Sequence, residues 1–488
     1  MIRPYVVTLL RLSLRSCGSA TAPRRQIALG PSIVIARAAG GQHATDCSSQ
    51  VYADTPDFNV SKVNFCLTSH RSRQANPTLT DNRNMAALFP DSAPPRSILV
   101  ICTRRIGDVL LTTPVVRSLK ARWPDAQIDM LVFNGTAGVL ENNSDIRRVI
   151  SVAQRAKLKE RFADARKIWR QYDLACAAMS SDRASFYSWF AGRKRIGIVL
   201  PAGKSWFKRL LLNRFAVEDP NLHMVQSGLS LMPLLDIASC PEVVAPGIGG
   251  QADRIAQLAQ QLAPAAGRPL AVVHLYPMYH YKMWHVEGWL AVIDWLRTHG
   301  YAIVLTGGPA DAEVAYTREI ADIAETTTGA GGAIINLAGQ LSLGETAEII
   351  RRAKLFIGPD TSVSHIAAAT GTPTIALFGP SNPVRWGPWP KDWAGNSPWK
   401  LSGSGRHGNV YLIQGSGACV PCKLEGCEAK LESWSDCLLM LDANRVIDAA
   451  AELLGMEPET APAATNAAQR RIPIVSTSVT RPRRLTPE

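Results

Sequence analysis

The chain has 488 residues, of which 46% are hydrophobic and 19% are charged, and it carries a formal net charge of +13. This composition is typical of a globular protein with two sizeable cores, and no apolar run reaches the about 18 residues that a membrane-spanning helix requires. Residues 1–84 hold ten Lys and Arg against four Asp and Glu, so the body of the chain is only mildly basic. That charge fits anionic substrates or an anionic membrane surface, and without a basic–aromatic array the sequence predicts no binding of nucleic acid.

Residues 1–95 are predicted to be a poorly ordered N-terminal extension. The segment is rich in Arg, Ser and Thr, and patterned sequence begins only at Ser97, after Met85 and a Pro-containing stretch. We therefore hypothesise that translation starts at Met85, which a peptide from upstream of Met85 in the native protein would rule out. Residues 457–488 are rich in Ala, Pro and Thr and are predicted to be a disordered tail.

The first patterned region predicts a βαβ unit. Residues 97–103 form an apolar run suited to a buried strand, a loop follows at 104–108, and a helical pattern continues to Arg122. After a turn, residues 128–132 read as the next strand. We assign an N-terminal Rossmann-like domain to residues 96–245.

A second alternating series begins at Leu270. A strand at 270–276 precedes a helix at 287–299, and a strand at 302–307 leads through the Gly307-Gly308-Pro309 turn into another helix. Pro and Gly accumulate before this series, so residues 246–268 are predicted to be a linker and 269–456 a C-terminal Rossmann-like domain. The predicted fold class is α/β, with parallel sheets whose ligands lie at the carboxyl ends of the strands.

Residues 355–370 carry the strongest site signal in this second domain. A buried strand leads into Asp360, Thr361 and Ser362, which can cap a helix that runs to about Thr370 before Gly371. The free N–H groups and the positive dipole end of such a helix favour a diphosphate. His365 lies one turn further along. An ordinary capped helix after a strand is the alternative interpretation of this segment.

Two rival nucleotide-binding motifs are not supported. The segment 197–205 resembles a P-loop but has one residue too many between its glycines, and Pro201 removes an N–H group from the loop. No GxGxxG motif follows the first strand, and no Asp-x-Asp metal motif occurs in the chain.

Three separated blocks of sequence together resemble glycosyltransferase family 9, the ADP-heptose:lipopolysaccharide heptosyltransferases. They are IGDVLLTTP at 106–114, Lys282-x-Trp284, and DTSVSHIAAA at 360–369 with LFGP downstream. Residues 301–309 and 385–389 look closest to the heptosyltransferase III branch. The resemblance covers about 97–455 and implies two Rossmann-like domains facing across a cleft, the GT-B type, that perform inverting, metal-independent sugar transfer.

The resemblance also implies roles for individual residues. Asp108 matches the proposed general base, although Asp is also a common N-cap residue. Lys282 matches the lysine that binds the donor phosphates, against the alternative of an ordinary exposed lysine. The remaining donor-binding and acceptor-binding residues are predicted as two groups. The donor group is Asp360, Thr361, Ser362, His365, Gly307 and Gly308, and the acceptor group is Arg104, Arg105 and Gly107.

The chain departs from the family pattern on the donor side. The usual glycine after Asp-Ser/Thr is Ser362 here, and a bulkier residue beside the phosphates could change which nucleotide sugar fits. Inverting sugar transfer is therefore a firmer expectation than ADP-heptose as the donor.

Four of the ten cysteines are concentrated near the end of the second domain, as Cys419-x2-Cys422-x4-Cys427-x9-Cys437. A CxxC pair with two further cysteines nearby is typical of a structural zinc or iron site. Free thiols and disulfides are the alternatives, and a reducing compartment disfavours the disulfides.

The resemblance thus implies a heptosyltransferase that acts on the inner core of lipopolysaccharide and needs no cofactor for catalysis. Its expected partners are a nucleotide-sugar donor, a lipid-linked oligosaccharide acceptor and an anionic membrane. We expect it to be cytoplasmic and peripheral on the cytoplasmic face of the inner membrane. The alternatives are a family 9 transferase that uses another nucleotide sugar, or a non-catalytic sugar-nucleotide-binding protein of the same fold.

Overall fold

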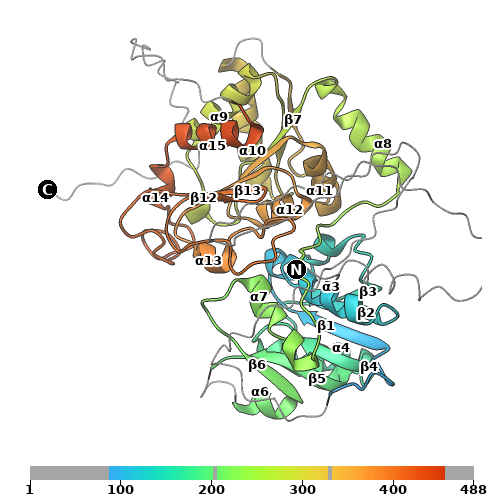
Figure 1. Ribbon diagram of the computed structural model, residues 1–488. Helices are drawn as coiled ribbons and strands as arrows, with labels where there is room; N and C mark the ends of the chain where they lie inside the picture. Colours follow the sequence, from blue (N-terminus) through green and yellow to red (C-terminus); the bar gives the residue numbers. More distant parts are fainter. Residues whose placement is uncertain (1–86, 202–205, 328–331, 457–488) are drawn as a thin grey trace, which may run out of the picture. The chain divides into compact units, whose positions relative to one another are not determined.

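The computed structural model describes residues 87–201, 206–327 and 332–456 (Figure 1). All of them belong to one compact unit of the chain, 66–488. Residues 1–86 of the predicted extension and the predicted disordered tail lie outside the described residues. Within the described part, no helix combines the length and the apolar character needed to cross a bilayer.

The N-terminal sheet is a six-stranded parallel sheet in the order β3-β2-β1-β4-β5-β6. This 3-2-1-4-5-6 order is that of a Rossmann fold. Buried apolar runs explain why the central strands form, since β1 is SILVIC and exposes almost nothing. The strands are β1 (Ser97–Cys102), β2 (Gln127–Phe133), β3 (Arg148–Val152), β4 (Tyr172–Ala177), β5 (Gly192–Val199) and β6 (Arg214–Val217).

Helices of the N-terminal half connect these strands. The α-helices are α2 (Ile106–Leu110), α3 (Thr113–Arg122), α4 (Leu158–Lys167), α5 (Asp182–Ala191), α6 (Trp206–Leu211) and α7 (Met224–Leu229). The 3₁₀ segments are η1 (Ala137–Leu140) and η2 (Met232–Leu235). We call this sheet and its helices the N-terminal lobe.

The C-terminal sheet has the order β12-β13-β11-β10-β7-β8-β9. Its strands are β7 (Leu270–His274), β8 (Ala302–Thr306), β9 (Ile334–Asn336), β10 (Leu355–Pro359), β11 (Thr374–Phe378), β12 (Gly405–His407) and β13 (Val410–Gln414). Only the β12–β13 pairing in this sheet is antiparallel. Without β12 the order is again 3-2-1-4-5-6, counted from β7. The predicted α/β architecture with two Rossmann-like halves is confirmed.

The C-terminal sheet and the helices that follow its strands form the C-terminal lobe. The helices are η4 (His280–Lys282), α9 (Val286–Thr298), α10 (Asp311–Thr327), α11 (Leu343–Arg352), α12 (Ser362–Thr370), α13 (Pro383–Trp386), α14 (Asp436–Leu439) and α15 (Ala443–Leu454). The segment predicted as a linker contains α8 (Ala252–Gln261) and η3 (Ala263–Ala265). Arg254 of α8 pairs with Glu141 in the N-terminal lobe and with Glu345 in the C-terminal lobe.

Sequence reasoning was wrong about the segment after β1. We expected a loop at 104–108 and one helix to Arg122, but two helices occur, and the first already contains Asp108. The cause is a capping box, in which the backbone N–H of Arg105 donates to Asp108 Oδ2 at 3.2 Å. Pro114 then lies in the first turn of α3, where a proline costs no helical hydrogen bond.

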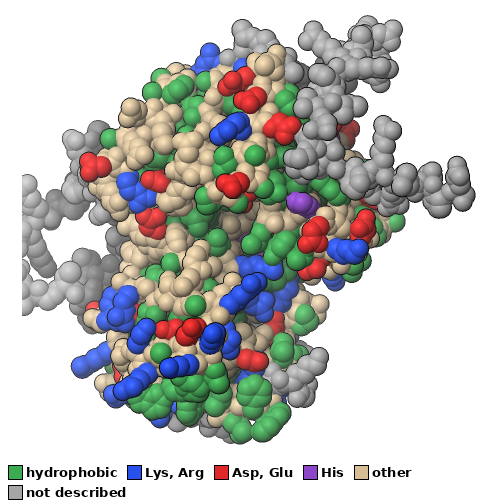
Figure 2. Space-filling view, turned by 180° about the vertical axis from the view of Figure 1, so that it is seen from behind, with side chains coloured by type: hydrophobic (Ala, Val, Ile, Leu, Met, Phe, Trp, Pro, Cys, Tyr) green, Lys and Arg blue, Asp and Glu red, His purple; other side chains and the backbone are tan. Residues whose placement is uncertain are grey.

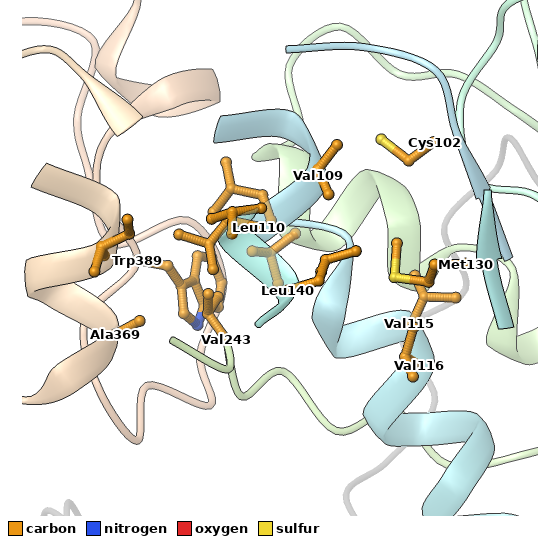
Figure 3. Packing of buried hydrophobic residues seen from close by; sticks show 14 of the residues in the cluster. Cys102, Val109, Leu110, Val115, Val116, Met130, Leu140, Val243, Ala369 and Trp389 are labelled. Carbon is orange, nitrogen blue, oxygen red and sulfur yellow. The ribbon is translucent and has the colours of Figure 1, made fainter. Parts of the chain in front are cut away.

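A continuous hydrophobic cluster joins the two lobes. Trp389, which is 2% exposed, and Ala369 from the C-terminal lobe belong to the same cluster as Leu110, Leu140 and Val243 (Figure 3). Polar contacts surround it, including a hydrogen bond of 2.7 Å between His223 Nε2 and the carbonyl oxygen of Gly387. The lobes therefore share apolar surface as well as polar contacts.

Candidate active site

Asp108 lies in α2, directly after the carboxyl end of the central strand β1. Its side chain is buried, and its carboxylate oxygens have different surroundings. Oδ2 accepts a hydrogen bond from the backbone N–H of Arg105, while Oδ1 is buried without a hydrogen-bond partner. Asp108 is not the N-cap residue of the alternative interpretation, because Arg105 is the N-cap of α2 and Asp108 lies three residues further along. One oxygen thus holds the helix start and the other is available to another molecule.

Burial raises the pKa of Asp108, and this outweighs the opposing influence of its neighbours. Those neighbours are the charge of Arg104, the N–H and charge of Arg105, and the charge of Arg385. A carboxylate with a raised pKa is a better proton acceptor than an ordinary exposed aspartate.

The start of α12 has the geometry expected of an anion site. The helix begins at Ser362, runs to Thr370 and ends at Gly371 in the left-handed region, as the sequence predicts. Thr361 is the N-cap, but its side chain accepts no capping hydrogen bond, and its Oγ1 is buried without a partner. The positive end of this nine-residue helix is therefore not neutralised by its own cap.

Lys282 points at this helix start. Its Nζ lies 2.6 Å from Asp360 Oδ2, and it also donates to the Asp360 carbonyl oxygen at 3.4 Å. Burial would raise the pKa of Asp360, but the ammonium group of Lys282 more than compensates and lowers it. Lys282 is therefore held by a buried partner, and it is not the ordinary exposed lysine of the alternative interpretation.

His365 brings the two lobes together at this point. A Cβ atom on Gly107 would lie 3.6 Å from His365 Cδ2, so α2 of one lobe contacts α12 of the other. Burial lowers the pKa of His365 to about 4, so the ring is neutral near pH 7, and its Nδ1 is buried without a partner. The structure thus brings Gly107, the residue before Asp108, against His365 in α12, so the helices that carry Asp108 and Ser362 are in contact.

The two predicted acceptor-binding arginines are exposed and occupy different positions. The guanidinium of Arg105 lies 5.0 Å from the ring centroid of Tyr279, which belongs to the C-terminal lobe. Arg104 lines a small cavity together with Glu218 and Arg385. Their role in acceptor binding stays a prediction.

Gly307 and Gly308 follow β8, which is separated from β10 by β7 in the sheet. They therefore share an edge with the α12 site, but no hydrogen bond or ion pair of the described residues links them to Lys282 or Asp360. The N–H of Gly308 donates to Glu313 Oε2 at 2.6 Å, and a Cβ atom on Gly308 would lie 2.7 Å from that oxygen. Burial raises the pKa of Glu313.

Sequence reasoning missed three residues near these sites. Glu313 carries a signal, because it follows the Gly-Gly-Pro turn in the first turn of α10. Glu218 and Arg385 form an ion pair between the lobes at the cavity beside Arg104. They are 167 residues apart, so no local pattern could have paired them.

The four clustered cysteines are free thiols close to one another. Burial, together with the neighbouring Cys427, Cys422 and Cys419, raises the pKa of Cys437 to about 12. The backbone N–H of Asp436 donates to Cys427 Sγ at 3.3 Å. Even so, no group of three or more His, Cys, Asp or Glu side chains within the described residues has the arrangement of a metal site. The residues as placed do not form a closed site, and the zinc or iron ion stays a prediction.

Metal analysis tests that prediction directly. If the cysteines hold zinc or iron, the purified protein contains about one ion per chain and the Cys422→Ser variant contains much less, because structural sites of this kind need all four ligands. Equal and negligible metal in both proteins would leave the cysteines as structural thiols.

Comparisons with known proteins point to one family. Residues 161–400 match the model of glycosyltransferase family 9 (heptosyltransferase). Over 302 residues the chain is 31% identical to lipopolysaccharide heptosyltransferase 3 of Escherichia coli. The alignment covers 59% of this chain and 86% of that protein.

Two solved structures share the fold. The glycosyl transferase family 9 protein of Veillonella parvula is 19% identical, with a TM-score of 0.58, and covers 74% of this chain and 97% of its own. The ADP-heptose LPS heptosyltransferase II of E. coli is 21% identical, with a TM-score of 0.55, and covers 73% and 98%. Since a relative 31% identical is matched over most of its length, the chain belongs to glycosyltransferase family 9, the heptosyltransferase family, and is a glycosyltransferase.

Proposed function

We propose that this glycosyltransferase transfers a heptose from ADP-heptose to the inner core of lipopolysaccharide, with inversion at the anomeric carbon and without a metal ion. The relative that is 31% identical is named for lipopolysaccharide heptosyl transfer, which supports the sugar and the acceptor. We further propose that the reaction takes place at the cytoplasmic face of the inner membrane, where a lipid-linked acceptor would be held.

The observation that carries the proposal is the pairing of two unlike groups at the contact of α2 with α12. Asp108 offers a buried carboxylate oxygen without a partner, and α12 offers an uncapped helix start beside Lys282. Transfer from a nucleotide sugar needs both: a proton acceptor for the incoming hydroxyl and positive charge for the departing diphosphate.

In the proposed reaction the acceptor hydroxyl gives its proton to Asp108 Oδ1 while its oxygen forms a bond to the anomeric carbon. The bond between that carbon and the diphosphate oxygen breaks, and both of its electrons leave with ADP. The N–H groups at the start of α12 and the ammonium group of Lys282 stabilise the negative charge that develops on the diphosphate. Asp360 keeps Lys282 in position.

A metal ion is not required for this charge balance. Lys282 and the helix dipole of α12 provide the positive charge that a divalent cation provides in enzymes with an Asp-x-Asp motif, and the sequence has no such motif. We therefore expect transfer to continue in the presence of excess EDTA.

A transfer assay tests the proposal. The purified protein is incubated with ADP-heptose and a deacylated inner-core oligosaccharide, and the product is analysed by mass spectrometry and NMR. We expect a product heavier by one heptose, with anomeric configuration opposite to that of the donor. A retained configuration, or a loss of activity with EDTA that a divalent cation restores, would contradict the mechanism.

One observation favours a nucleotide sugar other than ADP-heptose as the donor. Ser362 is the first residue of α12, where the family pattern has glycine, so its side chain stands beside the expected diphosphate. A panel of nucleotide sugars in a thermal-shift assay compares the candidates, because a ligand that binds only the folded protein raises the melting temperature. A larger shift with another nucleotide sugar than with ADP-heptose would favour a family 9 transferase with a different donor.

The acid limb of the pH profile should report Asp108. Protonated Asp108 cannot accept a proton, and its pKa is raised, so kcat/KM should fall with decreasing pH at a higher pH than for an ordinary aspartate. Arg104 exerts the largest opposing influence, so Arg104→Ala should move the midpoint further up. Arg122→Ala, which removes an exposed arginine absent from the groups that act on Asp108, should leave it unchanged. An acid limb that Arg104→Ala does not shift would separate the titration from Asp108.

A further inference from the structure

Three neighbouring helices of the N-terminal lobe expose large apolar side chains to solvent. Leu158 and Phe162 of α4 are 65% and 47% exposed, and Trp206 and Leu210 of α6 are 68% and 75% exposed. Trp189 of α5 lies between these helices, because α5 packs against both α4 and α6. Isolated exposed apolar residues are ordinary, but a continuous group of them marks an interaction surface.

Ring contacts show that part of this group is continuous. Phe162 of α4 packs against Phe190 of α5 with ring centroids 5.8 Å apart. Phe190 contacts Trp169 and Trp189, and the last two contact each other at 6.1 Å. The cluster therefore extends across α4 and α5 while Trp169 and Trp189 still face solvent.

The same surface is strongly basic. In its three segments, 155–170, 182–195 and 206–214, twelve Lys and Arg are at least partly exposed against three Asp and Glu, a net charge of +9 without the buried Lys208 and Arg214. Figure 2 shows basic and hydrophobic side chains interleaved on this part of the molecule. No single stretch of sequence carries this combination, because the surface is assembled from three separate segments.

The three acidic residues leave most of this charge unbalanced. Asp164 pairs with Lys167, and Asp182 pairs with Lys208. Glu160 accepts from the backbone N–H of Lys157 as part of a capping box. Each carboxylate already has a partner, so the surplus of exposed Lys and Arg faces solvent.

We propose that this surface, the exposed faces of α4, α5 and α6 with Trp169, docks on an anionic lipid bilayer. Trp and Leu side chains partition into the boundary between headgroups and acyl chains, and the surrounding Lys and Arg attract anionic headgroups. The exposed Leu158 and Leu210 favour lipid over nucleic acid as the partner. Nucleic acid bases stack on flat aromatic rings and gain little from exposed aliphatic side chains. The charge favours lipid over a second copy of the chain as the partner, because two surfaces of net charge +9 repel each other.

The docking surface borders the candidate active site. Ser181, the N-cap of α5, shares a hydrogen bond of 3.2 Å with Thr103, which directly follows β1. Lys208 of α6 donates to the carbonyl oxygen of Ser180, which lines the same cavity as Arg104. This step rests on the proposed function. Docking would then bring the edge of the N-terminal sheet that carries Arg104 and Asp108 close to a lipid-linked oligosaccharide acceptor in the membrane.

Vesicle sedimentation tests the surface with the full chain. The probe is a set of vesicles made of phosphatidylcholine, alone or with 30 mol% phosphatidylglycerol, at about physiological ionic strength. The Leu158→Ser/Trp206→Ser/Leu210→Ser variant removes three exposed side chains that support no core, so it should remain folded. We expect the native protein to bind the anionic vesicles, and the variant to bind at least tenfold more weakly.

A matched control removes three exposed apolar side chains from the C-terminal lobe, as Leu424→Ser/Leu431→Ser/Met440→Ser. It should bind anionic vesicles like the native protein, and every protein in the comparison keeps the same basic N-terminal extension. Equal binding by the native protein and the first variant would overturn the proposal. So would a dimer or an oligonucleotide complex that the first variant abolishes while vesicle binding persists.

Activity separates this inference from the proposed function. The first variant should transfer sugar to a soluble, deacylated acceptor as fast as the native protein, since none of its substitutions lies in the proposed site. Vesicle binding without any transfer would refute the proposed function and leave the docking surface standing. Transfer without vesicle binding would refute the docking surface alone.

Discussion

Asp108→Asn should lower the rate of transfer by about 10²-fold to 10⁴-fold while donor affinity stays nearly unchanged, the range expected when a general base is removed. The amide cannot take a proton from the acceptor hydroxyl. Its oxygen can still accept from the backbone N–H of Arg105, so α2 should keep its capping hydrogen bond. The measurement is steady-state transfer together with calorimetric titration of ADP.

The stability of the same variant distinguishes a lost base from a damaged fold. A carboxyl group whose pKa is raised on folding stabilises the folded protein only at low pH, and that contribution is lost as the pH rises through its folded pKa. Near pH 7 the buried, ionised Asp108 therefore costs stability. Asp108→Asn should melt at the same temperature as the native protein or higher, even though its transfer rate is strongly reduced.

Glu160→Gln is the matched control for this experiment. Glu160 occupies the same position in the capping box of α4, where its Oε2 accepts from the backbone N–H of Lys157 at 2.8 Å, but it is exposed and distant from α12 in the chain. It should leave transfer to a soluble acceptor unchanged. An active Asp108→Asn enzyme, or one that melts far below the native protein, would remove Asp108 from the proposed role.

Lys282→Ala should destabilise the folded protein by about 3 kcal/mol, because it leaves the buried carboxylate of Asp360 without its cation. The double variant Lys282→Ala/Asp360→Asn removes the unpaired charge and should recover most of that stability. Neither variant should transfer sugar at an appreciable rate, since both lack the ammonium group expected at the diphosphate. Chemical denaturation and the transfer assay measure the two effects separately.

Lys391→Ala is the control for the ion pair. Lys391 Nζ lies 2.5 Å from Glu242 Oε1, about as close as Lys282 Nζ is to Asp360 Oδ2, but both side chains of this pair remain partly accessible to water. Removal of such a pair costs at most about 1 kcal/mol. If Lys282→Ala were as mild as Lys391→Ala, or if the double variant regained transfer, Lys282 would not be the donor-phosphate lysine.

The sequence predicted the strand and helix of residues 355–371 well because their signals are local. The apolar run of β10, the polar residues before α12 and Gly371 after it stand next to one another in the chain, and each has a direct structural meaning. The capping box at Ser342 and Glu345, which begins α11, is equally local. The proposed phosphate-binding role of this segment still depends on the transfer and titration experiments.

The acceptor side was less predictable because its geometry depends on distant residues. Asp108 lies in a helix, where we predicted a loop, because its carboxylate caps the start of α2. Its pKa is raised by burial, which depends on packing that no local sequence pattern records. The ion pair between Glu218 and Arg385 joins two lobes, and the basic, apolar surface joins three helices. Such features appear only when the chain is folded.

The apolar cluster around Trp389 limits how the enzyme can admit its substrates. A wide hinge rotation would pull Trp389 and Ala369 away from Leu110, Leu140 and Val243 and expose all of them to water (Figure 3). Small sliding of α2 along α12 keeps this area covered. We therefore expect shear, with side chains changing partners, to govern the catalytic cycle.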